Sequence, residues 1–143
     1  MKEAETPPGE TVMFPSLQEV YRIRHEVLYP DRDISFVELP QDEDAIHWGW
    51  CVNDKLVSVI SLFEKENELQ FRKFATLKDE QGKGYGGRLL EKVIDYATEK
   101  GLKRIWCNAR EEAIELYRRY GLEPEGETWQ DNGITYTKMA KKI

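Results

Sequence analysis

The chain of 143 residues is 40% hydrophobic and 34% charged, with a net charge of −6, which fits one globular domain. Because its basic residues form no long run, we expect no broad nucleic-acid surface. No apolar run approaches the ~18 residues of a membrane span, and the first residues resemble no signal peptide. Cys51 and Cys107 lie far apart in apolar segments, which favours buried thiols over a metal site. We therefore expect a soluble cytoplasmic protein without metal, nucleic acid or membrane as a partner.

The first third of the chain predicts a tail, a short strand and one helix. Residues 1–10 are polar and rich in proline, so we expect a loose tail, followed by a strand over 11–14. Ser16 opens the pattern S-x-x-E of a capping box, and the apolar residues after it recur at helical spacing as far as Pro30. The segment from 31 to 44 has no period, and we interpret its run "QDED" as a solvated loop.

From His47 onward the apolar residues alternate with a period of two. The runs "HWGWCVN" and "KLVSVISLF" flank Asn53-Asp54, a pattern that predicts a β-hairpin. A third extended run, Leu69 to Thr76, follows a charged turn. Three consecutive strands after one helix indicate an antiparallel meander.

The rest of the chain alternates helices and strands. An amphipathic run over 86–100 predicts a helix that Gly101 terminates. The apolar run "KRIWCN" comes after it and should pair in parallel with the strand that precedes the helix. A short helix over 111–120 and a closing hairpin around Asp131-Asn132-Gly133 complete the chain. We therefore predict an α/β domain over 11–143, with a mixed central sheet, an antiparallel N-terminal meander and flanking helices.

A cluster of glycines, "EQGKGYGG" over residues 80–87, lies between the third strand and the long helix. Glycine mid-helix costs about 1 kcal/mol relative to alanine, so the cluster indicates a loop whose backbone approaches a ligand. The free N–H groups and the dipole at a helix N-terminus favour phosphate there. Lys83 and Arg88 would add positive charge at the rim. A plain tight turn is the alternative.

Three phosphate-binding patterns can be compared with this loop. A Walker A loop is excluded, because no lysine followed by Ser or Thr closes it. Gly82, Gly84 and Gly87 match the dinucleotide fingerprint G-x-G-x-x-G, but the next strand ends in Asn108 where an acidic residue should bind the ribose, and the chain is short for that fold. The third pattern, Q/R-x-x-G-x-G/A, fits Gln81, Gly84 and Gly86.

With this third pattern the chain resembles the GNAT superfamily of acetyl-CoA-dependent N-acyltransferases. The order of helices and strands from residue 11 onward is that of the family. The family segment A-x-x-x-Y-x-x-x-G-F is matched with leucine in the last position. The chain is also similar to a bacterial group of acetyltransferases without one common substrate, which carries "R-x-M-A-T", "N-A-R" and a closing "H-x-x-M". The corresponding residues are Ala113, Tyr117, Gly121 and Leu122 for the segment, and Arg72–Thr76, Asn108–Arg110 and Tyr136–Met139 for the group.

The resemblance implies a GNAT fold with splayed parallel central strands and a site for acetyl-CoA. Its diphosphate would lie on the loop amides, and its pantetheine arm would pair with the backbone of the third strand. Tyr117 would protonate the leaving thiolate, although a tyrosine on an apolar helical face is also a normal core residue. Asn108 would bind the pantetheine or, alternatively, cap the next helix. The implied cofactor residues are Phe74, Ala75, Thr76, Gln81, Gly82, Lys83, Gly84, Tyr85, Gly86, Gly87 and Asn108.

The acceptor side of the site is less defined. Histone-type members of the family use a glutamate where this chain has Gln70, which cannot act as a base. Glu68, His47 or a chain of water molecules remain as alternatives, and Tyr136 replaces the histidine of the bacterial group. We predict that Arg72 and His47 contact the substrate; an arginine would favour an acceptor with a carboxylate, whereas "QDED" would favour a cationic one.

Together these observations predict an N-acetyltransferase that transfers the acetyl group of acetyl-CoA to a primary amine by direct attack. The alternatives are an acyl-CoA-binding module without catalysis and a dinucleotide-dependent oxidoreductase. A homodimer is compatible with the exposed edge strands of a small sheet.

Overall fold

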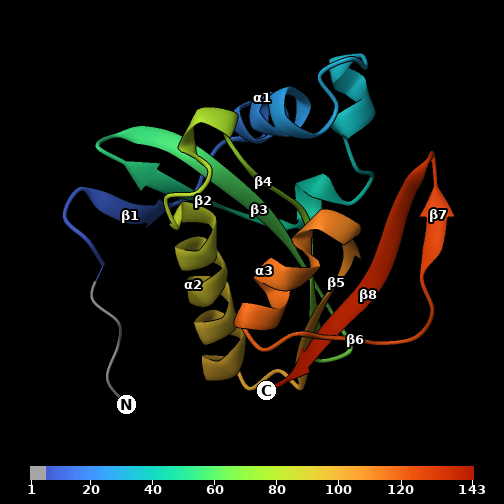
Figure 1. Ribbon diagram of the computed structural model, residues 1–143. Coiled ribbons are helices and arrows are strands. Elements are labelled where there is room, and N and C mark those ends of the chain that lie inside the picture. Colours follow the sequence, from blue (N-terminus) through green and yellow to red (C-terminus); the bar gives the residue numbers. More distant parts are fainter. Residues whose placement is uncertain (1–5) are drawn as a thin grey trace. The chain divides into compact units, whose positions relative to one another are not determined.

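The computed structural model describes residues 6–143 and contains one mixed sheet with flanking helices (Figure 1). Its strand order is β1-β2-β3-β4-β5-β8-β6, and β7 pairs with β8. The elements are β1 (Glu10–Met13), α1 (Leu17–Leu28), η1 (Ile34–Val37), η2 (Asp42–Asp44), β2 (Ile46–Val52), β3 (Lys55–Lys65), β4 (Glu68–Thr76), η3 (Lys78–Glu80), α2 (Tyr85–Glu99), β5 (Arg104–Arg110), η4 (Glu111–Ala113), α3 (Ile114–Arg119), β6 (Glu123–Pro124), β7 (Trp129–Asp131) and β8 (Ile134–Lys142).

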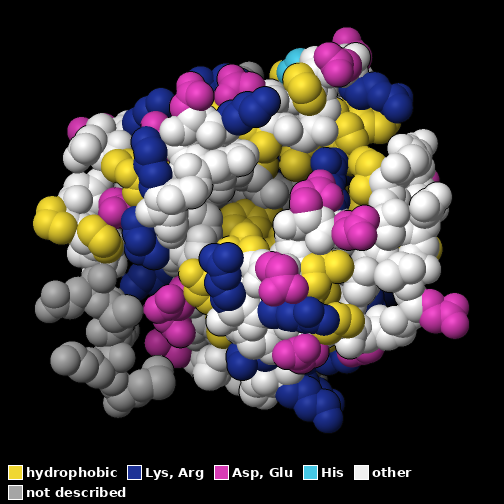
Figure 2. All heavy atoms as spheres, viewed as in Figure 1, with side chains coloured by type: hydrophobic (Ala, Val, Ile, Leu, Met, Phe, Trp, Pro, Cys, Tyr) yellow, Lys and Arg dark blue, Asp and Glu magenta, His cyan; other side chains and the backbone are white. Residues whose placement is uncertain are grey.

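The chain divides into two compact units. Unit 1 contains the described part of Met1–Ser61 together with Lys73–Leu89, and unit 2 contains Leu62–Arg72 and Leu90–Ile143. The strands β3 and β4 and the helix α2 each contribute residues to both units. On the face shown in Figure 2, acidic and basic side chains are interspersed.

The meander of unit 1 confirms the predicted hairpin. β1 and β2 are antiparallel, with Glu10 opposite Val52. Asn53 and Asp54 have φ values of 49° and 69°, the left-handed conformation of a two-residue hairpin turn. Residues 1–5 of the predicted tail lie outside the described residues. Glu10, which we also expected in the tail, is the first residue of β1.

The capping box predicted for α1 is present. The Ser16 hydroxyl accepts a hydrogen bond from the Glu19 N–H at 3.2 Å, and the Glu19 carboxylate accepts one from the Ser16 N–H at 2.9 Å. These bonds satisfy two backbone donors at the helix start. The buried face of α1 carries Val20 and Ile23, which pack in one cluster with Ala75 of β4.

The prediction of a solvated loop over 41–44 is wrong for one residue. Gln41, Glu43 and Asp44 are exposed, but Asp42 is only 1% exposed. Its carboxylate accepts two hydrogen bonds from the fully buried guanidinium of Arg24, at 2.8 and 2.9 Å. A buried arginine needs a partner for its charge. Asp42 is buried because it is this partner of Arg24.

Unit 2 contains the parallel pair and the C-terminal hairpin, both as predicted. β4 and β5 pair in parallel from Glu68 opposite Arg104 to Gln70 opposite Trp106, and β5 pairs antiparallel with β8. The short strand β6 was not predicted from the sequence, and α3 begins three residues later than expected because η4 precedes it. The β7–β8 turn uses Asn132 and Gly133, which have φ values of 52° and 76°.

Candidate functional site

The glycine loop of unit 1 is built by backbone geometry. Gly82 and Gly84 have φ values of +78° and +86°, a conformation that glycine adopts without steric cost. The Gln81 side-chain amide donates to the Thr76 carbonyl at 2.9 Å and ties the loop to the end of β4. The first turn of α2 follows directly, with the Arg88 N–H donating to the Gly84 carbonyl at 3.0 Å. The loop therefore connects the end of β4 to the N-terminus of α2. The first N–H groups of a helix have no intrahelical acceptor and can bind a ligand.

Gly86 allows α2 to start close to the end of β4. A Cβ atom on Gly86 would lie 3.0 Å from Thr76 Oγ1 and 3.3 Å from Phe74 Cζ. A larger residue would require the Thr76 and Phe74 side chains to shift by a few tenths of an ångström. Thr76 itself is engaged, since its hydroxyl shares a hydrogen bond of 2.9 Å with Ser58.

The Arg88 side chain stabilises the glycine loop through hydrogen bonds. Its Nε donates to Glu10 Oε1 at 2.7 Å, and its terminal NH2 group donates to the Lys83 carbonyl at 3.1 Å. The Trp50 indole donates to the same Glu10 oxygen at 2.8 Å, and the Glu10 side chain is only 8% exposed. We expected Arg88 to add a free positive charge at the rim of the loop, but its charge is paired with Glu10. The Lys83 side chain is half-exposed, and its ammonium lies 3.5 Å from the Glu80 carboxylate. Glu10 was missed because its position in the sequence suggested the tail.

The last residues of β4 depart from regular strand geometry. Lys73 has a φ of +53°, a left-handed conformation that interrupts the strand as a bulge does. Its ammonium group lies 4.9 Å from the centre of the Tyr29 ring. The Ser58 hydroxyl donates to the Ala75 carbonyl at 3.1 Å. The predicted splay between β4 and β5 involves residues of both units and stays a prediction.

Tyr117 in unit 2 is buried and packs against β4. The ring is 7% exposed and meets Phe71 edge-on, with 5.4 Å between the ring centres. Burial raises the pKa of the Tyr117 hydroxyl, with a smaller contribution from Cys107, while Arg110 acts in the opposite direction. The hydroxyl is therefore protonated at neutral pH, the state that a proton donor needs.

Asn108 lies within β5 and is exposed, opposite Lys138 of β8. The alternative role as a helix cap is wrong, because Arg110 and Ala113 occupy the cap positions of η4 and α3. A strand continues past Asn108 where we expected it to end, so the asparagine cannot reach the helix start.

Other candidates in unit 2 have protein partners. Arg72 extends over the Phe63 ring at 5.8 Å and is half-buried. Glu68, a candidate base, forms an ion pair with Arg104 at 3.2 Å. The Tyr136 ring stacks on Trp129 at 5.8 Å.

His47 belongs to the buried network around Arg24. Its Nδ1 shares a hydrogen bond of 2.7 Å with the Ser61 hydroxyl, and its Nε2 lies 2.7 Å from the Asp42 carbonyl. The Ser61 hydroxyl in turn accepts from Arg24 at 2.8 Å. Both ring nitrogens are thus used within unit 1, and the predicted substrate contact of His47 has no nitrogen left to make it.

The predicted site residues therefore fall into two sets. Unit 1 brings together the end of β4 and the glycine loop, that is Phe74, Ala75, Thr76, Gln81, Gly82, Lys83, Gly84, Tyr85, Gly86 and Gly87. Unit 2 contains Arg72, Asn108 and Tyr117. Among residues 6–143, no helix is long and apolar enough to cross a membrane.

A mixed sheet whose parallel strands β4 and β5 are connected by a glycine loop and a helix is typical of acyltransferases of the GNAT type. The family model described as "Acetyltransferase (GNAT) domain" matches residues 16–143. The chain belongs to this family of N-acetyltransferases, and both the predicted fold class and the predicted kind of enzyme are confirmed.

Relatives of the chain carry the same class name. The uncharacterized N-acetyltransferase YitI of Bacillus subtilis is 27% identical over 128 residues, which cover 83% of this chain and 86% of that protein. The ribosomal-protein-S18-alanine N-acetyltransferase of Escherichia coli has a similar structure, with a TM-score of 0.78, 21% identity, and coverage of 94% of each chain. A GNAT family acetyltransferase from Elizabethkingia anophelis, solved with acetyl-CoA bound, has a TM-score of 0.74 at 16% identity, covering 96% of this chain and all of that one.

Proposed function

We propose that the protein transfers the acetyl group of acetyl-CoA to a primary amine by direct attack. The observation that carries this proposal is the glycine loop, whose positive φ values at Gly82 and Gly84 present a helix N-terminus directly after β4. Such a terminus favours a diphosphate. The family relationship supports coenzyme A as its source, since the similar protein from Elizabethkingia anophelis holds acetyl-CoA.

In this proposal the loop from Gln81 to Gly87 binds the diphosphate through its backbone. Lys83 supplies positive charge, because its side chain is half-exposed and its ion pair with Glu80 is long, at 3.5 Å. Arg88 acts on the ligand only through the loop, since Glu10 already neutralises its guanidinium. The amides of the loop are thus held in place before the ligand arrives, which lowers the entropic cost of binding.

The backbone of Phe74, Ala75 and Thr76 would pair with the pantetheine arm, and an N–H group of this segment would polarise the thioester carbonyl. The hydroxyl of Thr76 bonds to Ser58, so only the backbone of this residue serves the ligand. Asn108 would add a side-chain bond to the pantetheine, and Arg72 would contact the acceptor.

The chemical step joins the amine nitrogen to the carbonyl carbon and breaks the carbon–sulfur bond. The amine must be neutral to attack, and its proton leaves through water, because Glu68 and His47 are engaged with protein groups. Tyr117 would protonate the departing thiolate. Burial raises the pKa of Tyr117, so its hydroxyl still carries the proton when the thiolate departs.

Thermal unfolding with acetyl-CoA tests donor binding. At a concentration 100 times its dissociation constant, a ligand stabilises the folded state by about 2.7 kcal/mol, and NAD should give no shift. Release of free thiol with a panel of primary amines then tests transfer. If neither acetyl-CoA nor CoA raises the melting temperature, the proposal is wrong. Binding without thiol release would instead favour a non-catalytic acyl-CoA-binding module.

A further inference from the structure

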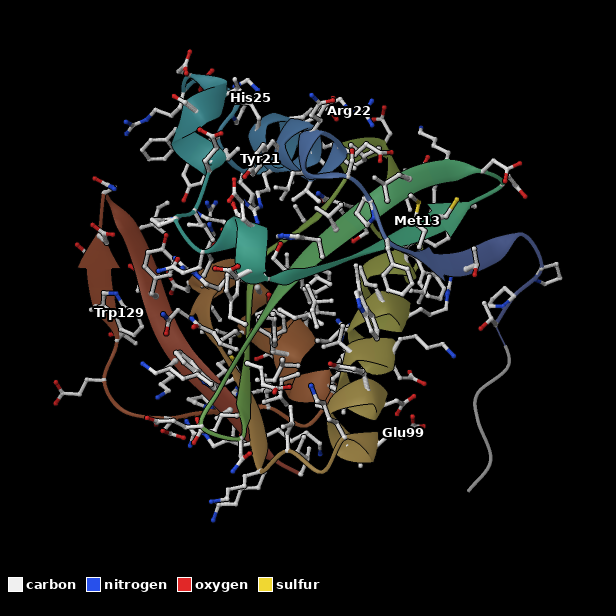
Figure 3. The ribbon with its side chains drawn as sticks, turned by 180° about the vertical axis from the view of Figure 1, so that it is seen from behind. Met13, Tyr21, Arg22, His25, Glu99 and Trp129 are labelled. Carbon is white, nitrogen blue, oxygen red and sulfur yellow. The ribbon has the colours of Figure 1, made fainter. Side chains whose placement is uncertain are left out.

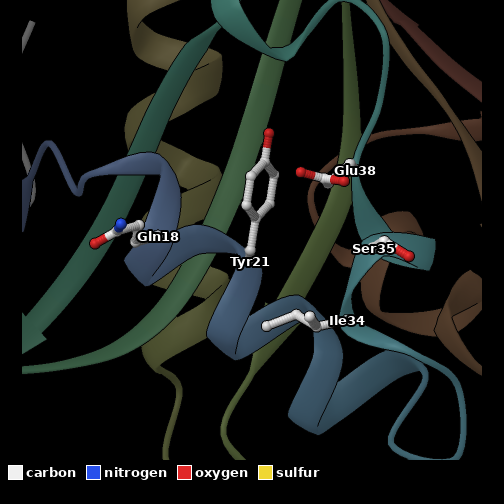
Figure 4. Close-up of a pocket in the computed structure, with 5 residues that line it drawn as sticks. All are labelled: Gln18, Tyr21, Ile34, Ser35 and Glu38. Carbon is white, nitrogen blue, oxygen red and sulfur yellow. The ribbon is translucent and has the colours of Figure 1, made fainter.

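A pocket of about 250 Å³ lies in unit 1 beside α1 and η1. Figure 4 shows its lining residues, Gln18, Tyr21, Ile34, Ser35 and Glu38. Tyr21 extends from α1, as Figure 3 also shows. The Glu38 carboxylate points toward the Tyr21 ring from the end of η1. The pocket combines two apolar side chains with an amide, a hydroxyl and a carboxylate, and all of its lining residues except Tyr21 are exposed.

The charge of the pocket is negative. Within residues 6–143, the carboxylate of Glu38 has no hydrogen bond or ion pair. The nearest buried cation, Arg24, is held by both oxygens of Asp42 at 2.8 and 2.9 Å. Burial raises the pKa of the Tyr21 hydroxyl, the charge and hydrogen bond of Asp42 raise it further, Arg24 acts in the opposite direction, and Glu38 makes the smallest contribution. A positive ligand group would therefore gain a partner that the protein does not supply.

The backbone on both sides of Glu38 is held in place by the buried ion pair. Arg24 donates to the Val37 carbonyl at 2.8 Å, and the Leu39 N–H donates to Asp42 Oδ2 at 2.8 Å. These bonds fix the residues before and after Glu38 from a fully buried anchor. The carboxylate consequently starts from a fixed backbone position, which lowers the entropic cost of binding a ligand.

The helix α1, which supplies Gln18 and Tyr21 to the pocket, also packs against the end of β4. Tyr21 packs against the buried cluster that contains Val20 and Ala75, and Ala75 is one of the residues proposed to bind pantetheine. All of these residues belong to unit 1. Tyr21 therefore belongs both to the pocket lining and to the packing around Ala75.

We infer that this pocket binds a primary ammonium group of the acceptor, at a nitrogen other than the one that is acetylated. The inference rests on the proposed function and names its acceptor class: a diamine, or a longer amine with a second cationic end. The ammonium group donates to the Glu38 carboxylate, whose oxygens point into the pocket beside the Tyr21 ring, whereas the Gln18 amide and the Ser35 hydroxyl point away from it (Figure 4). The alkyl stem lies against Tyr21 and Ile34. The bound ammonium keeps its charge, while the other nitrogen loses its proton and attacks.

Steady-state kinetics with α,ω-diaminoalkanes of increasing chain length test the inference against n-alkylamines of the same length. A diamine of suitable length should have a KM at least tenfold lower than the matching monoamine. Glu38→Gln should raise the diamine KM about tenfold or more, the loss of one charge-assisted hydrogen bond, with kcat nearly unchanged. Glu43→Gln is the matched control, because it removes an equal charge from an exposed residue outside the pocket. Equal diamine KM values in the two variants would overturn the inference.

Calorimetric titration of the same diamine into the protein with CoA present separates this inference from the proposed function. Binding that weakens in Glu38→Gln but not in Glu43→Gln supports the pocket, even if acetyl-CoA fails to stabilise the fold and the proposed function is wrong. Absence of diamine binding to protein that acetyl-CoA does stabilise overturns the inference alone.

Discussion

Replacing Asp42 by asparagine should strongly destabilise the protein, because it leaves a buried guanidinium without its anion. Arg24 is fully buried and donates four hydrogen bonds, two to Asp42 and one each to the Val37 carbonyl and the Ser61 hydroxyl. An asparagine side chain can accept only one of the two bonds to Asp42 and carries no charge. The remaining bonds of Arg24 do not compensate for the lost carboxylate.

The magnitude follows from the burial of both partners, whose side chains are 0% and 1% exposed. Removing one member of a buried ion pair costs about 3–5 kcal/mol, a large part of the roughly 5–15 kcal/mol that keeps a domain folded. For a chain of this length the loss corresponds to a fall in melting temperature of roughly 10–20 °C. Removing both charges, in Arg24→Met with Asp42→Asn, should cost less than the sum of the single changes by roughly 2–3 kcal/mol.

Urea unfolding followed by circular dichroism measures these free energies, with Glu43→Gln as the exposed control, expected within about 0.5 kcal/mol of the natural sequence. A loss below about 1 kcal/mol in Asp42→Asn, or additive single and double changes, would refute the role assigned to the pair.

The pH dependence provides a second test of the same pair. Burial by itself would raise the pKa of Asp42, but hydrogen bonds from Arg24 and the Leu39 N–H outweigh it and hold the pKa below its ordinary value of 3.8. A carboxyl group with a lowered folded-state pKa contributes stability that is fully present above the unfolded value and is lost as the pH falls through the folded one. The natural protein should lose stability in acid more steeply than Asp42→Asn; parallel pH profiles would contradict this.

Four further substitutions test the donor site and the proton donor. Gly84→Ala places a Cβ 2.8 Å from an Arg88 nitrogen, whereas Gly82→Ala meets nothing within 4 Å at a similar positive φ. The affinity for acetyl-CoA, measured by calorimetry, should therefore fall more in Gly84→Ala than in Gly82→Ala. Equal losses of affinity would contradict the role of Arg88 in stabilising the loop. Glu10→Gln releases Arg88 and should raise the dissociation constant of acetyl-CoA several-fold without lowering kcat; an unchanged constant would show that the loop needs no support. Tyr117→Phe should lower kcat by about 10²-fold or more with donor affinity nearly constant, and unchanged turnover would remove the tyrosine from the mechanism.

Local chemistry made much of the fold predictable. Ser16 and Glu19 form the expected capping box because both partners lie within one helical turn. Asn53-Asp54 and Asn132-Gly133 adopt positive φ values that few other residues tolerate. The parallel pairing of β4 with β5 followed from the helix between them.

Interactions between distant residues were not predictable. Asp42 stands among three exposed polar residues, and only a partner 18 residues away explains its burial. Glu10 stands beside a proline-rich tail, and its partner Arg88 lies 78 residues away. In both cases a buried or half-buried charge needs a counter-charge, but a single sequence does not reveal which one.

The same limitation affected the candidate site. The glycine loop was found because positive φ values favour glycine, and a cluster of glycines is visible in the sequence. The pocket beside η1 was missed because the segment from 31 to 44 shows no periodicity. The one local pattern that the segment offered, the acidic run, contains Asp42 and not Glu38.

The distribution of charge around α1 links the stability of unit 1 to the proposed acceptor. Arg24 is the one cation of the helix that reaches the interior, and Asp42 takes up its charge with both oxygens. Had Arg24 reached Glu38 instead, the pocket would be neutral and would favour an uncharged ligand. Arg24 and Asp42 neutralise each other and hold the backbone on both sides of Glu38. The Glu38 carboxylate is therefore held near the pocket and can bind a cationic ligand. Asp42→Asn should therefore weaken diamine binding as well as folding, whereas Glu38→Gln should weaken diamine binding alone.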